Sequence, residues 1–127
     1  MEEDKNLVMV DGKDSLDASG MVLKDRDILS TDGVIVAGVV MNHRNKEIIG
    51  GPDIQSRGVI YLKDADYIMK EVGNILEATI NTMVKEKRYD NLEARSEARE
   101  KIARYLLKET GKRPMILPAI VEINIQE

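Results

Sequence analysis

Apolar residues change their spacing along the chain, and each change predicts a different element. Residues 34–41, VIVAGVVM, are apolar at odd and even positions and rich in β-branched side chains. This run predicts a central strand covered on more than one side. A polar turn at 42–45 and the short return KEIIG at 46–50 follow it, which is typical of a β-hairpin. Residues 59–62, VIYL, form another short apolar run and predict a further strand.

An amphipathic helix is predicted over residues 64–87. Between positions 68 and 83, apolar side chains recur every three or four residues, which places them on one side of a helix. Asp64 and Asp66 stand at its start, and basic residues stand at its end. Both charges are favourable for the helix dipole.

A second helix is predicted to begin at Asp90. Glu93 stands three residues later, as in a capping box. Gly111 is expected to end this helix, because glycine readily adopts the left-handed conformation found there, and Pro114 prevents its continuation.

The last apolar run, residues 115–125, predicts a strand that joins the sheet. Pro118 is expected at the edge or the start of this strand, because proline cannot donate to a ladder. The predicted order is β-β-β-α-α-β. It predicts an α+β fold, with two helices packed on one face of a small, mainly antiparallel sheet of three to four strands. Residues 1–32 are interpreted as a connecting arm and residues 33–127 as the domain.

Composition limits the classes of protein to which the chain belongs. Its 127 residues include no cysteine and one histidine, so a disulfide framework and a thiolate zinc site are excluded and a cytoplasmic location is expected. The longest apolar run, 33–41, is far shorter than the ~20 residues that span a bilayer. We therefore expect no membrane partner. His43, the only histidine, is interpreted as a solvated turn residue, so no metal site and no catalytic residue is predicted.

Charge is distributed unevenly. Residues 85–113 carry ten basic and six acidic side chains, a net charge of +4, within a chain of net charge −4. A solvated helix face with locally paired charges explains this pattern. The alternative is a surface that contacts RNA phosphates. Phe and Trp are absent, so a stacking platform for bases is not expected. The candidate RNA contacts are Arg95, Arg99, Arg104, Lys108, Lys112 and Arg113.

The segment GGPDIQSRG, residues 50–58, has the composition of a turn. Its glycines permit positive φ, Pro52 restrains the backbone, and the Asp53 side chain can accept bonds from turn amides. A phosphate-binding loop is the alternative. That interpretation is weaker, because Gly58 is followed by strand-like residues instead of a helix.

Four separated segments resemble the C-terminal region of bacterial ribonuclease J. They read VMVDG (8–12), VLKDRDILSTDG (22–33), GPDIQSRG (51–58) and KRPMILPAIVEI (112–123). In that family a strand pair leads through a GPD-x-x-SRG segment into two helices, and the chain finishes in RRPMILP-x-x-x-E. The matching positions taken as candidate site residues are Gly51, Pro52, Asp53, Ser56, Arg57, Gly58, Arg113, Pro114 and Pro118.

The resemblance implies a function for this chain. Ribonuclease J is a metallo-β-lactamase/β-CASP nuclease whose catalytic module binds zinc and cleaves RNA internally and from the 5′ end. The histidine-rich zinc motif is missing here, so we expect a non-catalytic C-terminal domain without a cofactor, which supports subunit assembly and the activity of the full enzyme. The implied partners are a second copy or a paralogous ribonuclease J subunit, with RNA as a further candidate and no DNA. Arg57 is expected to bridge Asp53 or a neighbouring helix end.

Departures from the family pattern point to a divergent second paralogue. The arm DGKDSLDASG at 11–20 lacks glycines that are usual in the family, and Val59 replaces the usual aromatic after SRG. Two alternatives to an assembly domain remain at this point. One is an RNA-contacting accessory module that uses the basic helix face, and the other is an independent small protein that binds a phosphate ligand.

Overall fold

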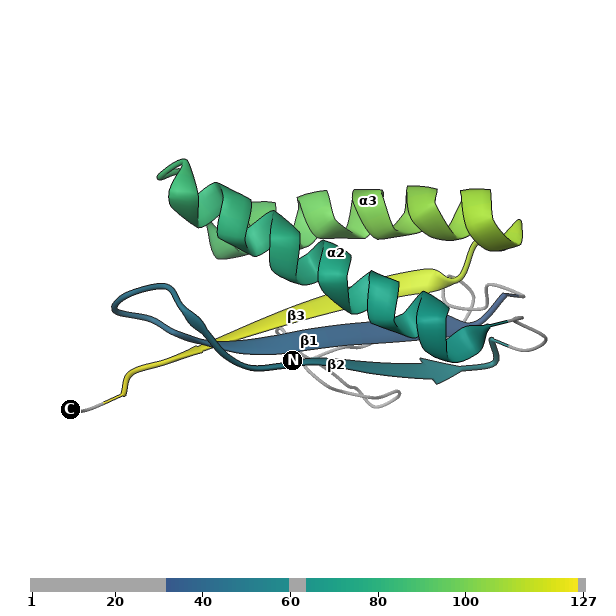
Figure 1. Cartoon of the computed structure of the whole chain (residues 1–127), viewed down its shortest axis with the longest axis horizontal. Helices are drawn as coiled ribbons and strands as arrows, with labels where there is room; N and C mark the ends of the chain where they lie inside the picture. The colour runs from purple at the N-terminus through teal and green to yellow at the C-terminus, as the bar shows by residue number, and fades with distance from the viewer. Residues whose placement is uncertain (1–31, 60–63, 126–127) are drawn as a thin grey trace, which may run out of the picture. The chain divides into compact units, whose positions relative to one another are not determined.

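The computed structural model describes residues 32–59 and 64–125. Within this part of the chain, three strands and two helices follow one another in the order β-β-α-α-β. Figure 1 shows both helices on the same side of the sheet. The elements are β1 (Val34–Asn42), β2 (Ile48–Arg57), α2 (Ala65–Lys85), α3 (Asn91–Thr110) and β3 (Met115–Ile123).

The predicted α+β fold is confirmed, and its sheet is mixed. The strand order is β2-β1-β3, so β1 is central, as its uninterrupted apolar sequence predicts. β2 pairs with β1 antiparallel, and β3 pairs with it parallel. Pro118 lies within β3, which is an edge strand of this sheet. The expectation that Pro118 occupies an edge is therefore confirmed.

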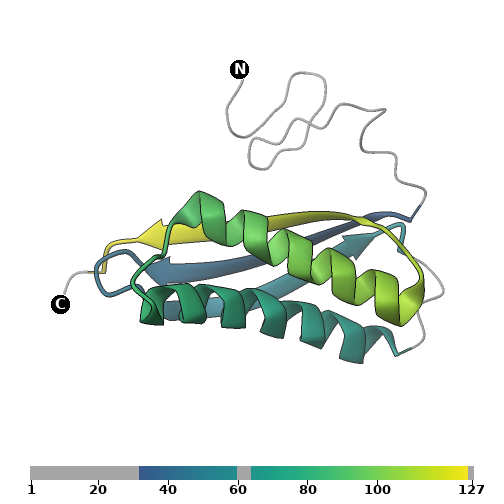
Figure 2. The ribbon, with the colours of Figure 1, turned by 90° about the horizontal axis from the view of Figure 1, so that it is seen from above.

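The lengths of the helices explain why β3 runs parallel to β1. α2 and α3 contain 21 and 20 residues, which corresponds to about 30 Å each at 1.5 Å per residue. β1 and β3 contain nine residues each, which also corresponds to about 30 Å. One helix therefore carries the chain along the sheet and the other carries it back. Figure 2, seen from above, shows the two helices side by side in front of the strands. β3 consequently starts at the same end as β1.

The prediction that residues 50–58 form a turn is wrong, because residues 48–57 form one continuous strand. Two irregularities in the pairing with β1, one between Gly38 and Val40 and one between Val40 and Met41, absorb the extra residues of β2. Bulges of this kind are frequent at sheet edges. Gly51 has φ 87°, and a Cβ there would lie 2.8 Å from the Gly38 carbonyl oxygen. Glycine at this position therefore serves a bulge instead of a turn.

The strand predicted at 59–62 falls mostly outside the described residues. Val59 is described, and it packs against the core without belonging to a strand. The predicted arm, residues 1–32, likewise lies outside the described residues except for Asp32.

The second helix, α3, begins and ends where sequence signals predict. The Asp90 side chain accepts a hydrogen bond of 2.9 Å from the Glu93 amide, which satisfies an otherwise unpaired donor of the first turn of α3. Gly111 ends α3 in the left-handed conformation, and its amide donates to the Leu107 carbonyl. Neither described helix has the length and apolar content needed to cross a bilayer.

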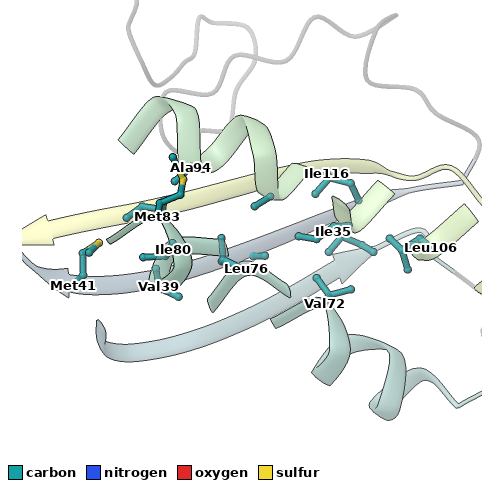
Figure 3. Packing of buried hydrophobic residues seen from close by; sticks show 14 of the residues in the cluster. Ile35, Val39, Met41, Val72, Leu76, Ile80, Met83, Ala94, Leu106 and Ile116 are labelled. Carbon is teal, nitrogen blue, oxygen red and sulfur yellow. The ribbon is translucent and has the colours of Figure 1, made fainter. Parts of the chain in front are cut away.

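A single apolar core lies between the helices and one face of the sheet. β1 contributes alternate residues, Ile35, Val39 and Met41 among them, and α2 contributes Leu76 and Ile80. Figure 3 shows these side chains meeting between the layers. Burial of a large aliphatic side chain stabilises the fold by about 1.5–3 kcal/mol. The core contains no phenylalanine or tryptophan, so branched aliphatic residues and methionine fill it.

Pro52 and Gly73 fix the position of α2 above β2. Gly73 is buried within α2, and a Cβ there would lie 3.1 Å from Cβ of Pro52. The missing side chain lets the helix approach the strand closely. The PDI part of the GPDIQSRG segment therefore has a packing role, in which Pro52 and Ile54 face the helix and Asp53 faces away.

We predict that Gly51→Ala destabilises the domain by ~1–3 kcal/mol, because alanine at positive φ is strained and its Cβ would collide with the backbone of β1. Gly50→Ala is the matched control in the same strand. A Cβ at Gly50 would make ordinary contact, at 3.5 Å from the Val40 side chain. Urea unfolding of both variants measures the difference. Equal loss of stability in the two variants would contradict the role assigned to Gly51.

Candidate functional site

Three of the family-matching segments meet at one end of the sheet. The Arg113 amide donates a hydrogen bond of 2.7 Å to Oδ2 of Asp32. The Met115 amide donates one of 2.8 Å to the Gly33 carbonyl. Val34, the next residue, is paired with Arg57. Asp32 and Gly33 are therefore joined to the SRG and KRP segments at the start of β1.

Close backbone contact explains the glycines at this end. Gly33 has φ 93° and Gly58 has φ 71°. A Cβ at Gly33 would lie 2.5 Å from the Arg57 carbonyl oxygen and 2.6 Å from the Gly58 carbonyl carbon, which no real side chain tolerates. Pro114 is buried beside this junction. These motif positions thus shape the backbone, and their side chains do not converge on a ligand.

Arg57 does not bridge Asp53, contrary to expectation. Both side chains are exposed on β2, and in the described part of the chain no ion pair or side-chain hydrogen bond involves either residue. The expectation assumed a turn that would bring the two side chains together. In a strand, four residues span about 13 Å, so the two charges stand apart on the same face.

A polar cluster at the opposite end of the sheet centres on Glu122 of β3. One carboxylate oxygen accepts hydrogen bonds from the Tyr89 hydroxyl at 2.6 Å and from Nδ2 of Asn91 at 2.9 Å. The other oxygen lies 2.7 Å from Nδ1 of His43 and 3.5 Å from Nζ of Lys46. This cluster, here called the Glu122 cluster, joins the β1–β2 turn, the α2–α3 turn and β3.

The surroundings of Glu122 favour its charged form. Burial by itself raises the pKa of this carboxyl group, but hydrogen bonds from Tyr89, Asn91 and His43, together with the Lys46 charge, outweigh that effect and lower the pKa from 4.5 to about 2. For Tyr89, burial and the adjacent Glu122 carboxylate raise the pKa well above its usual value. The tyrosine is therefore a fixed hydrogen-bond donor and the glutamate a fixed acceptor.

The Glu122 cluster is suited to holding loops in place and lacks the features of a reaction centre. His43 is more than half exposed, and every acceptor site on the carboxylate faces a donor of the same domain. Among the described residues, no group of three metal-binding side chains converges. The interpretation of His43 as an ordinary solvated turn residue misses its bond to Glu122. A useful signal was the single acid in the apolar strand MILPAIVEI, which also matches the final glutamate of the family pattern.

The six candidate RNA contacts do not form one surface. Arg95 and Arg104 are nine residues apart, which is two and a half turns at 3.6 residues per turn, so they point to opposite sides of α3. Arg95 also donates Nε to Oδ1 of Asn91 at 2.7 Å. Arg99 lies one turn after Arg95, and Lys108 lies one turn after Arg104. Lys112 and Arg113 stand in the loop after α3.

Two of the surface hollows that border the described residues contain no residue of 50–58. One, of about 370 Å³, has Arg104, Leu107 and Arg113 among its lining residues. The other, of about 190 Å³, is lined by Asn42, Arg44, Asn45 and Ile125. The phosphate-ligand hypothesis required converging donors around GGPDIQSRG, and the strand conformation of this segment gives it no support.

The sheet face turned away from the helices is apolar on β1 and β3 and polar on β2. It consists of alternate residues of each strand and is here called the open face. At the end of β3, Val121 is 52% exposed and Ile123 41% exposed, whereas Met115 and Leu117 are partly buried. Its members are Val34, Val36, Gly38 and Val40 of β1, Met115, Leu117, Ala119, Val121 and Ile123 of β3, and Asp53, Gln55 and Arg57 of β2.

Comparison with known proteins identifies relatives. The family model of the ribonuclease J C-terminal domain matches residues 21–123. Ribonuclease J 2 of Staphylococcus epidermidis is 34% identical over 116 residues, which cover 91% of this chain and 21% of that protein. Ribonuclease J 2 of Staphylococcus aureus matches with the same identity and coverage. The chain thus spans about a fifth of the length of the curated relatives it matches.

We predict that Glu122→Gln lowers the free energy of unfolding by about 1.5–3 kcal/mol at pH 7, the usual value for hydrogen bonds to a charged group. The pKa of Glu122 is depressed in the folded state, so this contribution is present above about pH 4.5 and is lost as the pH falls towards 2. In urea unfolding, the difference between variant and wild type should therefore be clearly smaller at pH 3 than at pH 7.

The exposed Glu47 of the same hairpin supplies the control, as Glu47→Gln. An equal effect of Glu122→Gln at the two pH values would show that the charge of Glu122 contributes nothing.

Proposed function

We propose that this chain, which belongs to the ribonuclease J C-terminal domain family, is a non-catalytic domain that supports the assembly and activity of a ribonuclease J. The observation that carries this proposal is the apolar open face. A contiguous apolar surface of this kind marks an interaction site. The sites at which chemistry would be expected are taken up by structural contacts, both at the motif junction around Gly33 and in the Glu122 cluster.

Catalysis belongs, in this proposal, to the part of ribonuclease J that the chain does not match. That part holds zinc, cleaves RNA internally and removes nucleotides from the 5′ end. The present chain binds no cofactor. The absence of cysteine from its sequence is in keeping with a cytoplasmic location.

The proposed partner is a second copy of the chain or a paralogous ribonuclease J subunit. The two relatives reported above are both named ribonuclease J 2, which supports the interpretation of the chain as a second paralogue. Neither a membrane nor DNA is proposed as a partner.

We predict that the purified 127-residue chain self-associates in the micromolar range and that Leu117→Arg on the open face makes it monomeric, because an unpaired charge would be buried on association. Leu92→Arg is the control, since Leu92 is 63% exposed on α3, in the helix layer on the other side of the sheet. Sedimentation velocity over a concentration series measures both. A wild-type chain that stays monomeric at high micromolar concentration would remove self-assembly from the proposal.

RNA contact is a second candidate function, favoured by one observation. Arg104 and Arg113 line the same hollow beside the exposed Leu107. Arg104→Glu should weaken retention of single-stranded RNA in a filter assay at low salt and reduce the salt slope by roughly 0.7 per lost contact. Arg99→Glu, on the other side of α3, should have a smaller effect. Absence of retention by the wild-type chain at the lowest salt tested would eliminate this function.

A further inference from the structure

We propose that the open face packs on the open face of a second copy, about a two-fold axis that passes over the row Gln55–Val36–Leu117. In this arrangement Asp53 of each copy faces Arg57 of the other. The inference rests on the proposed assembly function and specifies its surface and register. It follows from three features of the described residues: the two blocked sheet edges, the charges on β2, and the distribution of small and large residues about the central row.

The sheet edges are blocked against the addition of another strand. The Met115 amide points to β1, and in a parallel ladder alternate residues direct their backbone groups to the same side. Ile116, Pro118 and Ile120 therefore direct theirs to the outer edge of β3. Pro118 has no amide hydrogen to offer there, and the Ile120 carbonyl already accepts a bond of 3.1 Å from Asn91.

The outer edge of β2 is blocked in the same way. Along β1, residues whose backbone groups point to β3 alternate with residues whose groups point to β2. The latter are paired with Asp53, Gln55 and Arg57, so the backbone groups of these three residues point to β1. Those of Pro52 and Ile54 point outward, where Pro52 again lacks a donor. Proline on an edge strand opposes edge-to-edge pairing. A second copy consequently meets the face of the sheet and not its rim.

The charges on the open face of one copy complement those on the open face of a second copy. Asp53 and Arg57 lie on the same face of β2, exposed and unpaired within the described residues. They stand at equal distances on either side of Gln55. A two-fold axis through Gln55 and perpendicular to the strands exchanges their positions, so each acid meets a partner's base. In an isologous interface every such contact occurs twice.

Side-chain sizes are complementary about the same row. Val36 is paired with Gln55 and with Leu117, so these three residues define the axis. On one side of the row stand the small residues Gly38 and Ala119, which are partners in the ladder. On the other side stand the larger pair Val34 and Met115. The two-fold axis sets each large pair against a small pair, the alternation by which apolar layers interdigitate.

The separation of the layers suits these contacts. Two sheets packed face to face lie about 10 Å apart. An aspartate of one copy and an arginine of the other are together long enough to bridge this distance at the margin of the interface. The central row and the rows on either side of it hold nine of the twelve open-face residues of each copy, fewer than the roughly 20–30 residues of a standard interface. We therefore expect micromolar affinity for the isolated chain.

The test reverses each of the two charges in a separate variant and then mixes the two variants. Asp53→Arg places two bases on the face and Arg57→Asp places two acids on it, so each variant alone should associate at least about tenfold more weakly than wild type because like charges meet. An equimolar mixture of the two variants should regain association close to that of wild type. Asp53→Arg combined with Arg57→Asp in one chain should also restore it. Sedimentation velocity of the full 127-residue chain reports each case.

The matched control uses charges on a helix. Asp66 and Lys70 are exposed on α2 with the same four-residue separation, so Asp66→Arg, Lys70→Asp and their mixture should all associate as wild type does. Circular dichroism melting confirms that each variant is folded.

The outcomes separate this inference from the assembly function. If wild type associates but the single reversals associate equally well, the register is wrong and assembly uses another surface. If both reversals prevent association and their mixture does not regain it, the reciprocal pairing is wrong. A wild-type chain that never associates removes the assembly function and this inference together.

Discussion

Every described element depends on β1 being paired on both edges at once. Its outer neighbours run in opposite directions, and the helix hairpin between them must cross over it to connect them. All the large side chains that β1 directs to one side are covered by this hairpin. The same geometry leaves the other side of the strand without a helix. The face of β1 under the helices must be apolar, because it forms the core. The opposite face of β1 is apolar too, and no described element covers it.

The elements that were predicted well are those specified by local chemistry. The spacing of apolar residues predicts both helices, and Asp90 and Gly111 predict the limits of α3 to within a residue. The segment around Gly51 was misjudged because glycine and proline signal a turn locally, whereas here they serve an edge strand, its bulge and the close approach of α2. The strand direction of β3 depends on the matched lengths of two helices, a non-local property that no short window of sequence contains.

The candidate site shows the same division. The family-matching residues were identified from the sequence, but their roles became clear only when Asp32, Gly33 and Arg57 were seen in one place. Glu122 was missed as a residue of interest because its four partners, His43, Lys46, Tyr89 and Asn91, come from two turns that are far from it in the sequence. A single acid in an apolar strand signals that such partners exist, since burial of a charge is costly unless it is paired. It does not reveal which residues they are.

The parallel pairing of β1 with β3 also determines how the domain responds to mechanical force. Asp32 stands at the start of β1 and Ile123 at the far end of β3. Tension between these two points slides the strands past each other along their length, so all the hydrogen bonds between them bear the load together. An antiparallel pair held at one end would open bond by bond. The pairing of β1 with β3 is thus loaded in shear, the geometry in which a strand pair resists tension best.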